Sequence, residues 1–110
     1  MRTIETEEIT RNIKEMCIEA NHFLSADMER AMKCAARTEE APLGKRILGQ
    51  LQDNLEIAGK DMIPICQDTG MAVVFLEIGQ DIHLEGGSLA DAVNEGVRQG
   101  YTSGYLRKSV

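Results

Sequence analysis

The chain has 110 residues, a formal net charge of −6 and an apolar share of 43%, but only 4% of its residues are aromatic. A single domain over residues 1–110 is therefore expected, with a modest core filled by aliphatic side chains and methionines. The acidic balance argues against a nucleic-acid partner, because phosphate binding needs clustered Lys and Arg. No apolar run approaches the roughly 20 residues of a membrane span, and no targeting segment is visible, so we expect a cytoplasmic protein without a membrane partner.

The first half of the chain predicts three helices, because apolar residues recur there at helical spacing. Ser25 can cap the second helix, Pro42 suits the first turn of the third, and Gly59 is the expected end of the third. The expected bounds are about 6–22, 25–38 and 42–59.

The hydrophobic pattern changes after the third helix and predicts two strands. Residues 71–78 are nearly all apolar and lie between two glycines, which is typical of a strand buried on both faces. Residues 81–85 alternate between polar and apolar side chains, as in a short edge strand. Helices followed by strands predict an α+β fold.

A last helix is predicted over residues 88–104, with Ser88 as its cap after a Gly-Gly turn. Gly96, Gly100 and Gly104 lie four residues apart and therefore share one face of this helix. Glycine costs about 0.5–1 kcal/mol relative to alanine inside a helix, so another element must pack closely there. We expect that element to be the predicted strand rather than a second domain or subunit.

The three cysteines are an odd number and lack the Cys-x-x-Cys spacing. This argues against a disulfide framework and against a zinc site made by this chain alone. Cys17 falls on the apolar stripe of the first predicted helix and Cys34 borders that of the second, so we expect both in the core.

The segment from Pro64 to Gly70 places four reactive groups in succession: the thiol of Cys66, an amide, a carboxylate and a hydroxyl. Proline and glycine at its two ends favour a tight, rigid loop. From the residues alone, Cys66 is a small buried side chain in an ordinary turn, a nucleophile, or a metal thiolate. A nucleophile would want electropositive neighbours, and the nearest charged residue in sequence is Asp68.

Pro-x-Cys-Gln-Asp-Thr-Gly before an apolar segment resembles the signature of class I fumarases and L(+)-tartrate dehydratases. Residues 89–101 and 104–110 resemble the helix and the block that follow the loop in that family. The family normally runs on into an Asn- and Pro-containing segment that is absent here. We therefore expect residues 1–110 to be the truncated N-terminal part of a longer iron–sulfur hydro-lyase subunit.

The resemblance implies the chemistry of the site. In that family three cysteines hold a 4Fe–4S cluster that leaves one iron open for substrate. By match of motif, Cys66 is one cluster ligand, Gln67 and Asp68 contact the substrate, and Arg107 pairs with a substrate carboxylate. The other two ligands and the catalytic base lie outside this chain, so the isolated chain is expected to lack the cluster and activity.

The implied reaction is reversible hydration of fumarate to malate, or dehydration of tartrate. The implied partners are a small dicarboxylate, the rest of the subunit, and a beta-type domain or subunit. A strand that is apolar on both faces also favours an oligomer. The alternative is a non-catalytic scaffold or assembly module of a larger complex.

Overall fold

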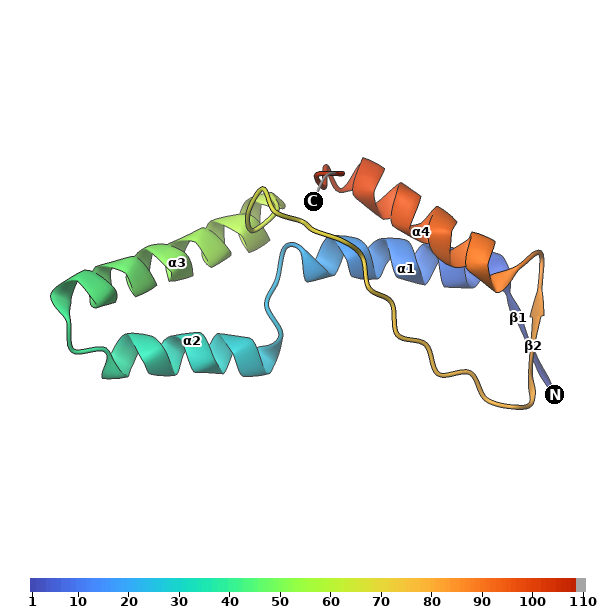
Figure 1. Ribbon diagram of the computed structural model, residues 1–110, viewed down its shortest axis with the longest axis horizontal. Helices are drawn as coiled ribbons and strands as arrows, with labels where there is room; N and C mark the ends of the chain where they lie inside the picture. The colour runs from blue at the N-terminus through green and yellow to red at the C-terminus, as the bar shows by residue number, and fades with distance from the viewer. Residues whose placement is uncertain (109–110) are drawn as a thin grey trace. The chain divides into compact units, whose positions relative to one another are not determined.

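The computed structural model describes residues 1–108 and confirms the α+β fold (Figure 1). The described elements are β1 (Arg2–Glu5), α1 (Thr6–Ala20), α2 (Ala26–Thr38), α3 (Pro42–Asp61), β2 (Ile82–Glu85) and α4 (Leu89–Ser103). They form two compact units, a sheet unit of Met1–Glu19 with Gln67–Val110 and a hairpin unit of Ala20–Cys66. Among the described helices, none is long and apolar enough to cross a membrane.

The four predicted helices are all present, with small shifts at their ends. Ser25 occupies the N-cap of α2 as predicted, but its hydroxyl donates to Asp27 Oδ1 at 2.5 Å and makes no side-chain cap bond. α3 continues past Gly59, the predicted end, and stops at Asp61. Its C-cap, Met62, takes the left-handed conformation with φ 53°, so a non-glycine residue ends this helix.

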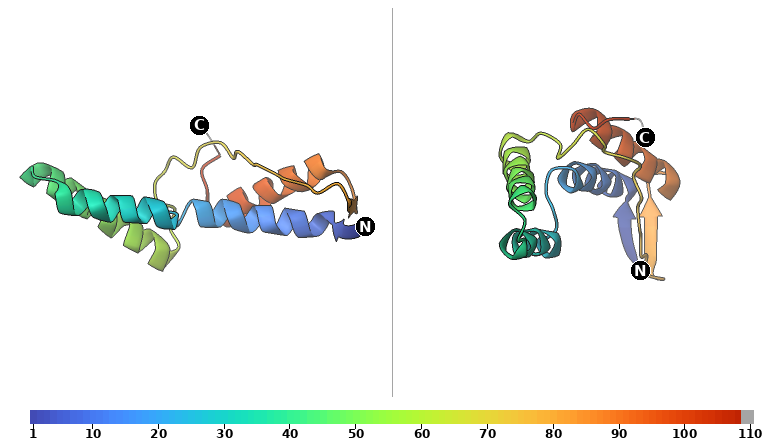
Figure 2. Two further views of the ribbon diagram at one scale, coloured as in Figure 1. Left: turned by 90° about the horizontal axis from the view of Figure 1, so that it is seen from below. Right: turned by 60° about the vertical axis from the view of Figure 1, so that its left-hand side comes forward.

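The hairpin unit is built from α2 and α3, which stay adjacent in the two views of Figure 2. Gly59 permits one close approach here, since a Cβ at this position would lie 2.9 Å from the Phe23 ring. After α3 the Ile65 amide donates to the Asn21 carbonyl at 2.8 Å, and the Asn54 side chain donates to the Ile65 carbonyl at 2.8 Å. These bonds fix the chain just before Cys66.

In the sheet unit, β1 and β2 pair in parallel, with Arg2 opposite Ile82 and Glu5 opposite Glu85. The pattern of residues 81–85 predicted β2, but β1 was not predicted. Four residues at the N-terminus carry too short a pattern, and their partner lies far along the sequence. β1 leads directly into α1, whereas a three-residue turn separates β2 from α4.

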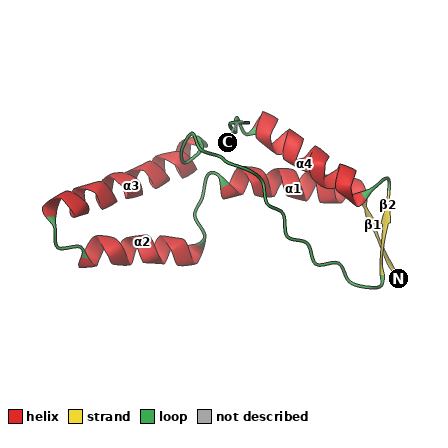
Figure 3. Ribbon diagram, viewed as in Figure 1, coloured by secondary structure: helices red, strands yellow, loops and turns green. Residues whose placement is uncertain are grey.

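The predicted buried strand at residues 71–78 is wrong. This segment is an extended connection without assigned secondary structure, drawn as loop in Figure 3. Its apolar side chains are open to solvent, with Met71 74%, Val73 70% and Phe75 91% exposed. A strand needs a hydrogen-bonded neighbour, and the two-stranded sheet found in residues 1–108 does not include this segment.

The glycine face of α4 packs on α1, so the expected contact with a strand is also wrong. A Cβ at Gly96 would lie 2.6 Å from the Cβ of Ile13 and 2.7 Å from the Thr10 carbonyl oxygen. A Cβ at Gly100 would lie 2.9 Å from the Cβ of Cys17. The small residues therefore let two helix backbones approach where larger side chains would hold them apart.

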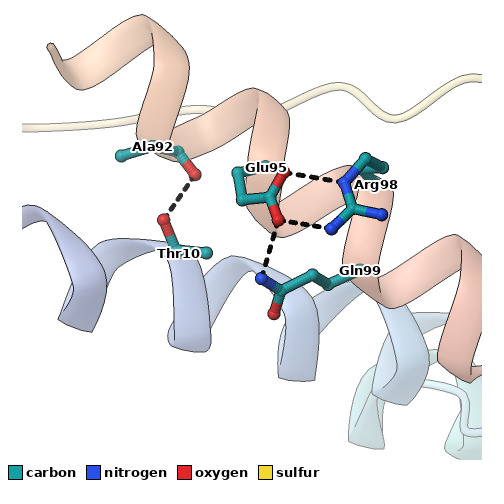
Figure 4. A network of polar contacts seen from close by, with 5 residues as sticks. All are labelled: Thr10, Ala92, Glu95, Arg98 and Gln99. Carbon is teal, nitrogen blue, oxygen red and sulfur yellow. Dashed lines mark hydrogen bonds and ion pairs between the residues drawn. The ribbon is translucent and has the colours of Figure 1, made fainter.

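Polar contacts accompany this packing (Figure 4). The Thr10 hydroxyl donates to the Ala92 carbonyl at 2.8 Å and ties α1 to the first turns of α4. On α4 itself, Arg98 and Gln99 both donate to the carboxylate of Glu95. These hydrogen bonds lower the pKa of Glu95 to about 2, and the bond from Arg98 has the largest effect.

The turn before α4 is formed as predicted. Gly86 and Gly87 have φ of 103° and 137°, a region that other residues rarely adopt. The Ser88 side chain then accepts a hydrogen bond from the Asp91 amide at 3.0 Å and caps the helix.

Replacing Gly96 with alanine should destabilise the protein, because the new Cβ would overlap Ile13 and the α1 backbone. We expect a loss of about 1–3 kcal/mol in the free energy of unfolding, as for overpacked cores. Gly49→Ala is the matched control, since a Cβ at that helical position meets nothing within 4 Å. The control should gain roughly 0.5–1 kcal/mol. Urea unfolding of the two variants measures both, and equal stability would contradict close α1–α4 packing.

Candidate functional site

The loop that carries the reactive groups begins where the two units join in sequence. Cys66 is the last residue of the hairpin unit, and Gln67 resumes the sheet unit. Cys66, Gln67 and Asp68 are exposed, whereas Thr69 is buried with 9% exposure. The exposed thiol contradicts the interpretation of Cys66 as a small buried side chain. The loop therefore presents a thiol, an amide and a carboxylate, and is anchored by the residue that follows them.

That anchor brings Arg107 to the loop. The Thr69 hydroxyl donates to the Arg107 carbonyl at 2.8 Å, across 38 residues of sequence. Asp68 directly precedes Thr69 in the sequence. The hydrogen bond between Thr69 and Arg107 therefore links the segment that carries Asp68 to Arg107, and both are predicted substrate residues. The side chain of Arg107 is itself exposed.

Tyr101 on α4 also holds this loop. Its hydroxyl lies 3.0 Å from the Thr69 carbonyl and 3.4 Å from the Gly70 carbonyl, and donates to them. Burial raises the pKa of the Tyr101 phenol above its ordinary value, and the protonated hydroxyl is the donor in both bonds. Gly70 has φ +60°, a left-handed conformation suited to glycine at the end of the loop.

Sequence reasoning missed the part that Thr69 and Tyr101 play. A signal was present for Tyr101, which is one of two tyrosines in a chain poor in aromatic residues. It follows Gly100 on the helix that was expected to pack closely. A half-buried tyrosine there needs a partner for its hydroxyl, but the sequence alone does not identify the Thr69 carbonyl.

A groove of about 340 Å³ lies beside the loop within the sheet unit. Its lining residues are Gly70, Ala72, Val97, Arg98, Tyr101, Thr102 and Lys108. Arg98 is already paired with Glu95, with an N–O distance of 2.5 Å. Lys108 therefore offers a second cation to the groove, whereas Arg107 is not among the lining residues.

The hairpin unit contains a separate cavity of about 390 Å³, with the buried His22 in its lining. Phe23 and Met32 supply part of its apolar wall, and Glu29 and Lys33 part of its polar one. It contains none of the predicted site residues.

The two remaining cysteines differ from each other. Cys17 is partly buried in the α1–α4 contact, and burial raises the pKa of its thiol. Cys34 is exposed, so its expected place in the core is wrong. The reason is that α2 buries none of its residues. Within residues 1–108, no three His, Cys, Asp or Glu side chains are grouped so that they could hold a metal ion.

Known proteins resemble this chain over most of its length. The family model described as fumarate hydratase (Fumerase) matches residues 10–110. A putative L(+)-tartrate dehydratase subunit alpha from Methanocaldococcus jannaschii is 32% identical over 104 residues, which cover 94% of this chain. The anaerobic class I fumarate hydratase of Escherichia coli is 28% identical over 107 residues, or 96% of this chain.

The same alignments cover much less of the two relatives. The chain spans 36% of the length of the tartrate dehydratase subunit and 19% of the fumarate hydratase. No solved structure matches the chain significantly.

The three thiols should differ in reactivity as their surroundings do. At pH 8, iodoacetamide should alkylate Cys66 and Cys34 several times faster than Cys17, because both are exposed while burial raises the pKa of Cys17. The thiolate is the reacting form, so a raised pKa slows the reaction. Mass spectrometry of the digested, labelled chain gives the three rates. Slow labelling of Cys66 beside fast labelling of Cys34 would contradict the exposed loop.

Proposed function

The chain belongs to the fumarate hydratase family, as the loop motif predicted, and on that premise we propose that it supplies part of the active site of an iron–sulfur hydro-lyase. In the complete enzyme, Cys66 is one of three thiolate ligands of a 4Fe–4S cluster. The reaction is reversible hydration of fumarate to malate, or dehydration of tartrate. The observation that carries the proposal is the exposed Cys66-Gln67-Asp68 loop, tied through Thr69 to Arg107.

The donor chemistry of the loop fits one ligand of such a cluster. Cys66 offers an exposed thiol, and thiolates are the usual ligands of iron–sulfur clusters. The family resemblance assigns the other two ligands to another part of the protein, and the described residues group no three metal-binding side chains. We accordingly expect the isolated chain to lack the cluster. When bound, an iron with an open coordination position supplies Lewis-acid chemistry toward the substrate hydroxyl.

The chain's own contribution is to bind and orient the dicarboxylate. We assign the Gln67 amide to the substrate oxygens and Asp68 to the neighbourhood of its hydroxyl or the attacking water. Arg107 pairs with one carboxylate, a task for which the planar guanidinium is suited. The chain carries a net charge of −6, so a dianion must meet positive charge concentrated locally. The adjacent Arg107 and Lys108 provide it.

The groove beside the loop supports a small substrate. Its volume of about 340 Å³ lies at the lower end of the usual range for ligand pockets, roughly 300–1,000 Å³. Lys108 lines it while Arg107 does not, so the groove favours Lys108 as a second contact, to be separated from Arg107 by experiment. The catalytic base is assigned to another domain.

We further propose that the chain works in the cytoplasm with a beta-type domain or subunit, as part of an oligomer. The exposed apolar segment at residues 71–78 supports the partner and the oligomer, because an extended chain with open apolar side chains is suited to pairing with another strand. The tartrate dehydratase relative is named as an alpha subunit.

Substituting Cys66 with serine in the complete enzyme should remove the cluster and abolish hydro-lyase activity. A serine oxygen is a poor substitute for a thiolate on iron, so both iron content and the absorbance near 400 nm should fall. Iron analysis of the purified variant measures the loss.

Cys17→Ser and Cys34→Ser are the matched controls for this experiment. Neither cysteine matches a family ligand, and one lies in the α1–α4 contact while the other is exposed on α2. Both variants should keep their iron, although Cys17→Ser should lower stability. Equal iron loss in Cys17→Ser and Cys66→Ser would show that the ligand assignment is wrong.

Arg107→Lys should not preserve activity if Arg107 makes a bidentate carboxylate contact, because an ammonium group cannot reproduce the planar fork. Loss of such a contact should cost on the order of 2–4 kcal/mol in transition-state binding, or tens- to hundreds-fold in kcat/KM. Lys108→Ala should cost far less. Steady-state kinetics, with iron content checked, compares the two variants. A larger loss of kcat/KM in Lys108→Ala than in Arg107→Lys would assign the carboxylate contact to Lys108 in the groove.

A further inference from the structure

We propose that the hydroxyls of Thr69 and Tyr101 are positioning groups for the substrate, which set the place of Gln67 and Asp68 relative to Arg107. This inference rests on the proposed function and goes beyond it, since it assigns the two hydroxyls to backbone carbonyls of the loop and of Arg107. We refer to the two side chains together as the loop clamp.

The loop clamp fixes the loop at two successive carbonyls and at one hydroxyl. Tyr101 donates to the carbonyls of Thr69 and Gly70, and Thr69 donates to the carbonyl of Arg107. Thr69 is buried, so displacing the loop would leave its hydroxyl without this acceptor away from water. The same three bonds therefore hold the exposed Gln67 and Asp68 on one side and Arg107 on the other.

The clamp is positioned by the close contact between α4 and α1. Tyr101 follows Gly100, whose missing Cβ lets α4 approach Cys17 and the backbone of Lys14 in α1. Tyr101 could not be displaced together with α4 without breaking this close contact between the two helices. The packing of α1 on α4 thus sets the position of Tyr101. The hydrogen bonds of the Tyr101 phenol in turn set the position of the loop.

Accurate placement matters because a displacement of about 1 Å in a bound substrate can cost as much as a hundredfold in rate. Removing one hydroxyl of the clamp should let the loop shift and lower kcat/KM about tenfold, less than the hundredfold that a full displacement can cost. Iron content should not change, since Cys66 is not part of the clamp. A purely structural bond would instead lower stability and leave kinetics unchanged.

The test compares four variants of the complete iron–sulfur enzyme. Tyr101→Phe and Thr69→Val each remove a clamp hydroxyl, whereas Thr69→Ser retains one and should rescue activity. Thr10→Val is the matched control, because it removes a side chain to backbone hydrogen bond of the same 2.8 Å length between α1 and α4. We expect kcat/KM to fall only in Tyr101→Phe and Thr69→Val. Thermal stability should fall in these two variants and also in Thr10→Val.

The inference is overturned if Tyr101→Phe and Thr69→Val keep kcat/KM near the wild-type value, or if Thr69→Ser is no better than Thr69→Val. It is also overturned if Thr10→Val loses as much activity as they do, because the clamp would then be one structural contact among others.

A second measurement uses the 110-residue chain without cluster or substrate. In its ¹⁵N NMR spectrum, Tyr101→Phe should shift the amides of Gly70 and Met71, which share peptide groups with the accepting carbonyls. If the clamp couples its two ends, the same variant should also shift the Lys108 amide, whose peptide group contains the Arg107 carbonyl. An unmoved Lys108 amide would overturn the coupling.

The two experiments separate the inference from the function on which it rests. A complete enzyme without hydro-lyase activity would reject the proposed function, while the NMR shifts would still report the clamp. An active enzyme with an unshifted Lys108 amide would reject the clamp alone.

Discussion

The close contact between α1 and α4 is the constraint on which the sheet unit depends. Gly96 and Gly100 allow the two backbones to approach, and alanine at either position would meet α1 atoms at 3.0 Å or less. β1 leads directly into α1, and β2 leads into α4 through a short turn, so the pairing of the helices and the pairing of the strands are parts of one arrangement. The Gly-Gly turn and the Ser88 cap set the start of α4 within it.

The candidate site lies at the other end of α4. The helix ends near Tyr101 and Arg107, and these two residues contact the loop through the Thr69 carbonyl and hydroxyl. Different residues of the loop therefore have different roles. The thiol, amide and carboxylate of residues 66–68 belong to exposed residues, while the buried Thr69 attaches the loop to Arg107. Such a division suits the proposed site, in which the remaining groups are assigned to another part of the protein.

The sequence predicted the elements that depend on local signals. The four helices, the Ser88 cap and the short strand β2 follow from periodicity, capping residues and alternation. The loop motif also predicted the family and indicated the candidate site residues. Arg107 was named from the motif, but nothing in the sequence related its backbone to Thr69.

What the sequence did not predict depends on contacts between distant residues. β1 exists because residues some eighty positions later pair with it, and the Tyr101 hydrogen bonds span more than thirty residues. The apolar run at 71–78 was expected to be buried because apolar strands usually are, yet none of the described residues covers it as a sheet partner. Cys34 was expected in the core for a similar reason, and α2 turned out to bury no residue.

The measurement that tests this account most directly is a crystal structure of the complete enzyme, reconstituted with iron and soaked with a dicarboxylate. The account predicts that Cys66 Sγ is bonded to iron, that a substrate carboxylate meets the Arg107 guanidinium, and that Thr69 still donates to the Arg107 carbonyl. A cluster held entirely by other cysteines, with Cys66 remote from iron, would contradict it.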